Sequence, residues 1–203
     1  MALPIEPVGS SYRMLTAEQA RRQGYLDLAA WLDRVQVEWA QRRGAKAEAH
    51  TALEWLDYSR KLTGQNPQAA YRVLYPSSGT YLCASVEPQH PIFFESAGQS
   101  VSATGFAVDH VTYHLETSNE NEANFLAAVL NAPITDQLLK PLQARGQWGP
   151  RHLHKKVLEL PIPQYDERRP EHGRLAALGQ VCSEKVAAWL AAGGPGRTQS
   201  IGR

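Results

Sequence analysis

The architecture of the chain follows from Tyr113-His-Leu-Glu-Thr-Ser-Asn-Glu-Asn-Glu-Ala-Asn-Phe-Leu-Ala-Ala-Val-Leu-Asn-Ala-Pro133, which carries a strand signal and a helix signal in succession. The alternation of apolar and polar residues up to Glu116 predicts a strand. Asn119 can cap the helix that follows, with Glu122 three residues later, and Pro133 closes it. This order predicts an α+β fold, with a mixed or antiparallel sheet and helices packed across it.

Further strands are expected on both sides of this stretch. Tyr71–Tyr75 and Thr80–Val86 flank Pro76-Ser-Ser-Gly79, whose proline and glycine favour a hairpin turn. The strand before Asn119 is expected to begin at Phe106, and the small polar residues 96–105 are expected to form a loop. After a short helix over 134–143, residues 156–161 are expected to form a last strand that prolines confine to an edge.

Helices are expected at both ends of the chain. Residues 1–15 read as a flexible leader, and Thr16 with Gln19 predicts a capping box at the start of a helix that runs to about Arg43. With a second helix over 45–62, this predicts an N-terminal helical hairpin over 16–66 and an α+β domain over 67–192. The last helix, over about 171–192, is expected to turn Leu175, Leu178, Cys182 and Trp189 inward, ahead of a disordered tail at 193–203.

Bulk properties exclude several classes of protein. The 203 residues carry a net charge of +1, so the chain is not a polycation, and nucleic-acid contact would need a local basic patch. The two cysteines, Cys83 and Cys182, form no C-x-x-C pattern, which disfavours a zinc ribbon. No apolar stretch approaches the ~18 residues of a membrane span and no signal-peptide pattern is evident, so we expect a cytoplasmic protein without membrane contact.

Positive charge gathers in one segment. Residues 116–136 contain no Lys or Arg, whereas residues 140–156 contain five and no carboxylate. Glycines allow the backbone there to approach a ligand closely, the cations can pair with phosphates, and Trp148 can stack on a base. The alternative is a solvated charged loop with Trp148 anchored in the core. The predicted DNA-binding residues are Arg145, Trp148, Arg151, His152, His154, Lys155 and Lys156, with Arg60, Lys61 and Arg72 as a weaker second group.

Catalytic chemistry is not indicated by the sequence. It has no nucleotide-binding glycine loop and no nucleophile elbow, and the carboxylates at 116–122 are explained by a helix N-terminus. His152-Leu-His154 could place two imidazoles on one side of a strand, joined by His172 or His110, but no further ligand lies at a recognisable spacing. We therefore predict no catalytic residue and no metal site, with a metal-dependent hydrolase as a minor alternative.

A series of motifs resembles one family. Glu54-Trp-Leu-Asp-Tyr-Ser-Arg-Lys-Leu-Thr-Gly-Gln-Asn-Pro67 and the segment 71–79 resemble the region that follows the catalytic domain in large N6-adenine DNA methyltransferases, including fused restriction–modification enzymes. Asp109–Tyr113 and Ala127–Pro133 continue the series. It is completed by Lys140–Gly146, Arg151–Lys156 and Leu160–Pro163, so that the match covers about 50–185.

This resemblance implies a C-terminal target-recognition region without its catalytic part. The family's N-P-P-Y-type tetrapeptide and its S-adenosylmethionine motif are absent, and Asn66-Pro67 is a bare dipeptide in a turn. The chain is then not an enzyme on its own. It would bind double-stranded DNA beside a methyltransferase catalytic domain or subunit that holds the S-adenosylmethionine and accepts the flipped adenine.

An alternative function is a protein-interaction module. The helices that carry Trp31, Trp39 and Trp55 could dock on a catalytic subunit while the basic segment is merely solvated. Both hypotheses assign the chemistry to a partner, and they differ in whether this chain contacts DNA.

Overall fold

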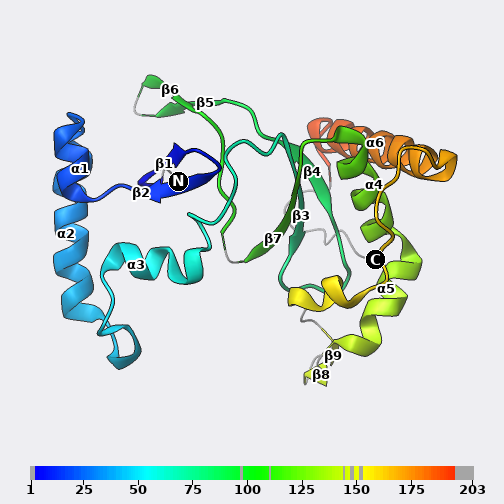
Figure 1. Cartoon of the computed structure of the whole chain (residues 1–203), viewed down its shortest axis with the longest axis horizontal. Coiled ribbons are helices and arrows are strands. Elements are labelled where there is room, and N and C mark those ends of the chain that lie inside the picture. The colour runs from blue at the N-terminus through cyan, green and yellow to red at the C-terminus, as the bar shows by residue number, and fades with distance from the viewer. Residues whose placement is uncertain are drawn as a thin grey trace. The chain divides into compact units, whose positions relative to one another are not determined.

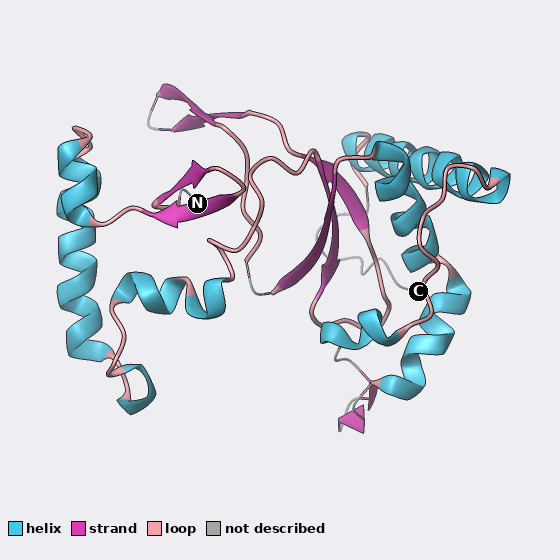
Figure 2. Cartoon of the chain, viewed as in Figure 1, coloured by secondary structure: helices cyan, strands magenta, loops and turns pink. Residues whose placement is uncertain are grey.

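The structure is a computed structural model of the chain. It divides into two units: residues 1–68 with 92–109, and residues 69–91 with 110–203 (Figure 1). Helices and antiparallel strands occur in both units (Figure 2), which confirms the predicted α+β class. The described residues are 3–96, 98–109, 111–143, 145–146, 149–150 and 153–194.

The first unit begins with a strand hairpin rather than a leader. Strand β1 (Ile5–Val8) pairs antiparallel with β2 (Ser11–Met14), so the expectation of a flexible segment over 1–15 is wrong. Gly9, at the turn, has a φ of 60°, a conformation that glycine adopts without a steric cost. The hairpin is tied to the rest of its unit by a hydrogen bond of 3.1 Å from Tyr12 N to Thr63 O.

The helix predicted after the leader is divided in two. Helix α1 (Ala17–Arg22) has the predicted capping box, in which Thr16 Oγ1 accepts from Gln19 N and the Gln19 side chain accepts from Thr16 N. The chain then turns through Gly24, whose φ is 81°, before α2 (Leu26–Arg42) begins. Ala20, Ala29 and Leu32 are buried between the two helices.

The second long helix predicted over 45–62 is wrong. This segment holds only a 3-10 turn η1 (Ala45–Ala47), the short α3 (Ala52–Leu56) and a 3-10 turn η2 (Tyr58–Arg60). Thr51 starts α3 with a capping box of its own, formed with Glu54. The first unit also contains a hairpin in which β5 (Ile92–Ser96) pairs with β6 (Gln99–Ala103). Most of this hairpin's second half lies in the region 96–105, where a loop was predicted.

The sheet of the second unit has the order β4-β3-β7. Strand β3 (Tyr71–Pro76) lies where predicted. Strand β4 (Ser85–Pro88) begins later than predicted, because residues 77–84 form a longer connection than a tight hairpin. Strand β7 (Thr112–Thr117) also begins later than the predicted Phe106. Successive side chains of β3 point to opposite faces. Val73 and Tyr75 face the main hydrophobic core.

Helices cover one face of this sheet (Figure 1). Helix α4 (Glu120–Asn131) begins at the predicted cap, where Asn119 Oδ1 accepts from Asn121 N and Glu122 N, and it buries Phe125 and Leu130. Pro133 ends α4 and also occupies the first turn of α5 (Pro133–Leu139), a position that suits proline because its missing N–H has no partner there. The 3-10 turn η3 (Lys140–Leu142) follows.

The last helix, α6 (Pro170–Ala191), packs along α4 with an unexpected face. Its buried residues are His172, Ala176 and Gly179, so the prediction of a buried large-residue face is wrong. A Cβ on Gly179 would lie 2.2 Å from Asn124 O, which shows how closely the backbones of α4 and α6 approach each other. The residues predicted inward, Leu175, Leu178, Cys182 and Trp189, are instead exposed.

No helix among the described residues is long and apolar enough to cross a membrane. The predicted tail at 193–203 lies almost wholly outside the described residues, which end with Gly193 and Gly194.

Candidate nucleic-acid interface

The basic segment, residues 140–156, contains a two-stranded ribbon that follows η3. Strand β8 (Arg145–Gly146) pairs antiparallel with β9 (Gly149–Pro150), and the register sets Gly146 opposite Gly149. Gln147 and Trp148 connect the two strands in the sequence and lie outside the described residues. The ribbon was not predicted, because two residues per strand are too few to show an alternating pattern.

Leu153 anchors the segment to the second unit. Its backbone N and that of His154 each donate to Ser77 O at 3.0 Å, which ties the segment to the end of β3. The 3-10 helix η4 (His154–Glu159) follows, where a strand over 156–161 was predicted. Leu153, Val157 and Leu160 are buried in the main core cluster. These three apolar residues thus fix one side of η4 in the core, and His154 and Lys155 lie on the side exposed to solvent.

The exposed side of η4 carries the candidate cations. His154 and Lys155 are exposed, and the His154 ring lies edge-on to the Tyr113 ring at 6.3 Å between centroids. Lys156 is paired with Glu159 at 2.8 Å, which lowers its net contribution to a basic surface. Within the described residues Lys155 makes no ion pair, so it is the cation of η4 most available to a phosphate.

The other predicted contacts of this segment fall outside the described part of the structure. They are the side chain of Arg145 and the residues Trp148, Arg151 and His152. The described positions of the segment that bear on DNA binding are therefore His154, Lys155 and Lys156.

Arg72 is not part of an exposed surface, which corrects its prediction as a DNA contact. Its side chain is fully buried, and its Nε lies 3.4 Å from Glu116 Oε1. Its Nη1 also donates to Gln89 Oε1 at 2.7 Å. A guanidinium held in this way stabilises the sheet and cannot reach a phosphate.

Arg60 and Lys61 belong to the first unit, whereas the basic segment belongs to the second. Arg60 is exposed at the end of η2, and Lys61 pairs with Asp109 at 3.3 Å. Their turn is rigidly built, because Asp57 Oδ1 accepts from the backbone N of both Leu62 and Thr63. Arg60 and Lys61 therefore form a second candidate DNA contact, on a turn that is held by hydrogen bonds within the first unit.

An aromatic cluster close to Arg60 in the sequence includes Trp39 and Trp55, which were predicted as part of a protein-docking surface and not as DNA contacts. The ring centroids of Trp55 and Tyr58 lie 5.4 Å apart, and that of Trp39 lies 5.6 Å from that of Trp55. Trp55 and Tyr58 are both exposed, and such rings can stack on bases. Trp55 belongs to α3 and Tyr58 to η2, and their i, i+3 spacing in the sequence is the signal that could have indicated the contact between the two rings.

The sheet face opposite the helices carries a polar group around Glu116. His114 Nε2 lies 3.5 Å from Glu116 Oε1, which also faces Arg72. Burial lowers the pKa of His114; the Glu116 carboxylate opposes that effect and Arg72 adds to it. On the core side, burial raises the pKa of Tyr75 to about 12, with a further electrostatic contribution from Tyr113, whose ring stacks on that of Tyr75. These shifts follow from packing and do not indicate catalysis.

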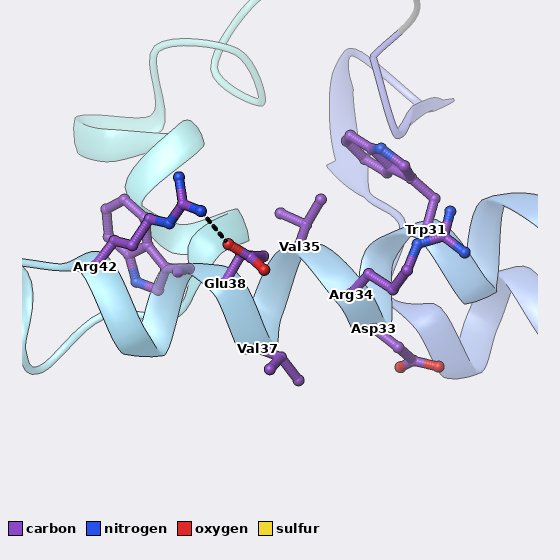
Figure 3. Close-up of a pocket in the computed structure, with 8 residues that line it drawn as sticks. Trp31, Asp33, Arg34, Val35, Val37, Glu38 and Arg42 are labelled. Atoms are coloured by element: carbon purple, nitrogen blue, oxygen red, sulfur yellow. Dashed lines mark ion pairs between the residues drawn. The ribbon is translucent and has the colours of Figure 1, made fainter.

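A metal centre and a ligand pocket are the other kinds of site for which the described residues can be assessed. No group of three or more His, Cys, Asp or Glu side chains there could hold a metal ion; His152 and His110 lie outside it. A hollow of about 740 Å³ is lined by residues of α2 alone, including Trp31 and Val37. Figure 3 shows these side chains pointing to different sides of the helix, so they do not enclose a ligand.

Comparisons with known proteins identify no relative. No protein-family model matches the chain, and neither a curated protein nor a solved structure matches it. The family resemblance consequently rests on the sequence motifs alone.

Proposed function

We propose that the chain is a DNA target-recognition domain for adenine-N6 methylation, with the catalytic domain or subunit supplied elsewhere. The observation that carries this proposal is the charge of residues 140–156, which include five Lys or Arg and no carboxylate. In a chain of net charge +1, such a segment concentrates the attraction for a phosphate backbone at one place.

The local geometry is compatible with this role. The major groove of DNA admits a two-stranded β-ribbon, and β8 with β9 is such a ribbon, shortly before η4 in the sequence. Lys155 would contact a phosphate. Lys156 would contact a second phosphate once its ion pair with Glu159 is broken. Arg151 and Trp148 are assigned to base readout and stacking on their chemistry alone.

Methyl transfer would depend on the partner. The Asn66-Pro67 dipeptide lies in a local turn in which Asn66 Oδ1 accepts from Gln68 N at 2.9 Å, and the residues that follow it do not complete the catalytic tetrapeptide of the family. S-adenosylmethionine would be bound by the catalytic partner, and the present chain would position the DNA for adenine extrusion.

A second candidate, a protein-interaction module without DNA contact, is favoured by exposed apolar side chains on α2. Trp31 and Val37 are 45% and 57% exposed. In this case the helix would dock on the catalytic subunit and the cations of η4 would remain solvated. Large exposed apolar side chains are typical of such surfaces.

Titration of the full chain with fluorescently labelled duplex DNA at low salt distinguishes the two functions. DNA target recognition predicts saturable binding that weakens as salt is added. Absence of binding at low salt, together with formation of a complex with a methyltransferase catalytic subunit, would reject DNA recognition and support the interaction module.

A further inference from the structure

An exposed apolar stripe runs along α6. Its members are Leu175, Leu178, Cys182, Val186 and Trp189, and at 100° per residue they fall within an arc of about 80°. Leu178, Val186 and Trp189 are 59%, 54% and 48% exposed. The neighbouring side of the helix, with Ala176 and Gly179, is already used against α4, so this stripe is a second apolar face.

The stripe is symmetric about Cys182. Leu178 and Val186 lie four residues to either side of it, and Leu175 and Trp189 lie seven residues to either side. A two-fold contact requires one patch to be complementary to itself. In an antiparallel pairing centred on Cys182, Leu175 would meet the Trp189 of the other copy, and Leu178 would meet its Val186.

Charge selects the antiparallel direction. In a parallel pairing Arg174 would lie beside Arg174 of the other helix, and Lys185 beside its Lys185. Both pairs of like charges would repel each other. In the antiparallel pairing the two Lys185 residues are about 9 Å apart along the axis, and Arg174 lies beside the last turn of the other helix, where the helix dipole is negative.

We infer that α6 pairs with α6 of a second copy of this chain, antiparallel and centred on Cys182. The helix has 22 residues and is therefore about 33 Å long, so one face about 10 Å wide covers only a few hundred Å². A stable interface takes about 800 Å² per partner. The dimer is accordingly weak and reversible, and it forms as the protein concentration rises.

Light scattering on the full chain over a concentration series tests this pairing. The mass should rise from 22.5 kDa toward twice that value, and Leu178→Glu/Val186→Glu should remain monomeric at every concentration. The control is Ala177→Glu/Ala188→Glu, which adds the same two charges at exposed positions of α6 outside the stripe and should dimerise like the wild type. Circular dichroism checks that each variant is folded.

A short bis-maleimide then tests the register. It should link two chains through Cys182, so that Cys182→Ser abolishes the covalent dimer and Cys83→Ser, at the other exposed cysteine, retains it. A wild type that stays monomeric at all concentrations would overturn the inference. A dimer that survives Leu178→Glu/Val186→Glu, or that links through Cys83 alone, would overturn it equally. DNA binding through η4 would be unaffected by either result.

Discussion

Arg72 on β3 lies directly opposite Glu116 on β7, and its Nε is 3.4 Å from Glu116 Oε1. The arginine is fully buried, while the Glu116 side chain is 25% exposed. Gln89 Oε1 accepts a second hydrogen bond of 2.7 Å from the same guanidinium. The centre of the sheet therefore contains a hydrogen-bonded ion pair, and a residue that reads as a surface cation in the sequence belongs to the interior.

Arg72→Met should destabilise the fold by about 3 kcal/mol, because it leaves the Glu116 carboxylate without its buried partner. The measurement is urea unfolding followed by circular dichroism. Arg72→Met/Glu116→Gln removes the uncompensated charge as well and should recover a substantial part of the stability. A decrease below about 1 kcal/mol for the single variant would contradict the buried pairing.

His114 makes stability depend on pH. Its pKa is lowered in the folded state by burial, so below the unfolded pKa of about 6.5 the unfolded chain binds a proton that the folded chain does not. Its contribution to stability is present above about pH 6.5 and is lost as pH falls toward the folded pKa, with a slope of at most about 1.4 kcal/mol per pH unit.

Urea unfolding of wild type and His114→Gln between about pH 8 and pH 5 measures this effect, over a window of roughly one and a half units either side of the unfolded pKa. The difference in unfolding free energy between the two proteins should change across that range in favour of the variant at low pH. A constant difference would show that His114 titrates alike in both states. Carboxylates titrate in both proteins, so their contribution cancels.

Two glycines of α6 should respond oppositely to the same substitution. Gly179→Ala places a methyl 2.2 Å from Asn124 O and should destabilise the protein by about 1–3 kcal/mol, since neither backbone can move freely. Gly173→Ala meets nothing within 4 Å and should stabilise the helix by about 0.5–1 kcal/mol. Thermal unfolding of both variants checks this contrast, and equal effects would contradict the close approach of α4 and α6.

Local signals in the sequence identify the helix starts. Thr16 with Gln19 and Asn119 with Glu122 involve residues that are close along the chain, and the caps form at the predicted positions. The failures concern residues whose environment is set by distant parts of the chain. Leu175 and Leu178 are larger than Ala176 and Gly179, yet the small residues are buried because they allow α4 to come close.

The candidate site shows the same division. The clustering of charge over 140–156 is visible in the sequence, whereas the anchoring through Leu153, Val157 and Leu160 is not, because the sequence predicts an edge strand over 156–161. Nothing in the spacing distinguishes Arg72 from an exposed arginine, because its burial depends on Glu116 and Gln89, which lie 44 and 17 residues away in the chain. Pairing across a sheet decides its role.

Salt dependence of DNA binding tests the central claim most directly. The slope of log affinity against log salt is measured for wild type, for Lys155→Ala/Lys156→Ala and for the control Arg168→Ala, an exposed arginine outside the basic segment. Removal of one lysine–phosphate pair should reduce the slope by about 0.9, so the double variant should show a reduction of between one and two such steps while the control keeps the wild-type slope. A double variant with the wild-type slope would contradict the assignment of η4 to the DNA interface.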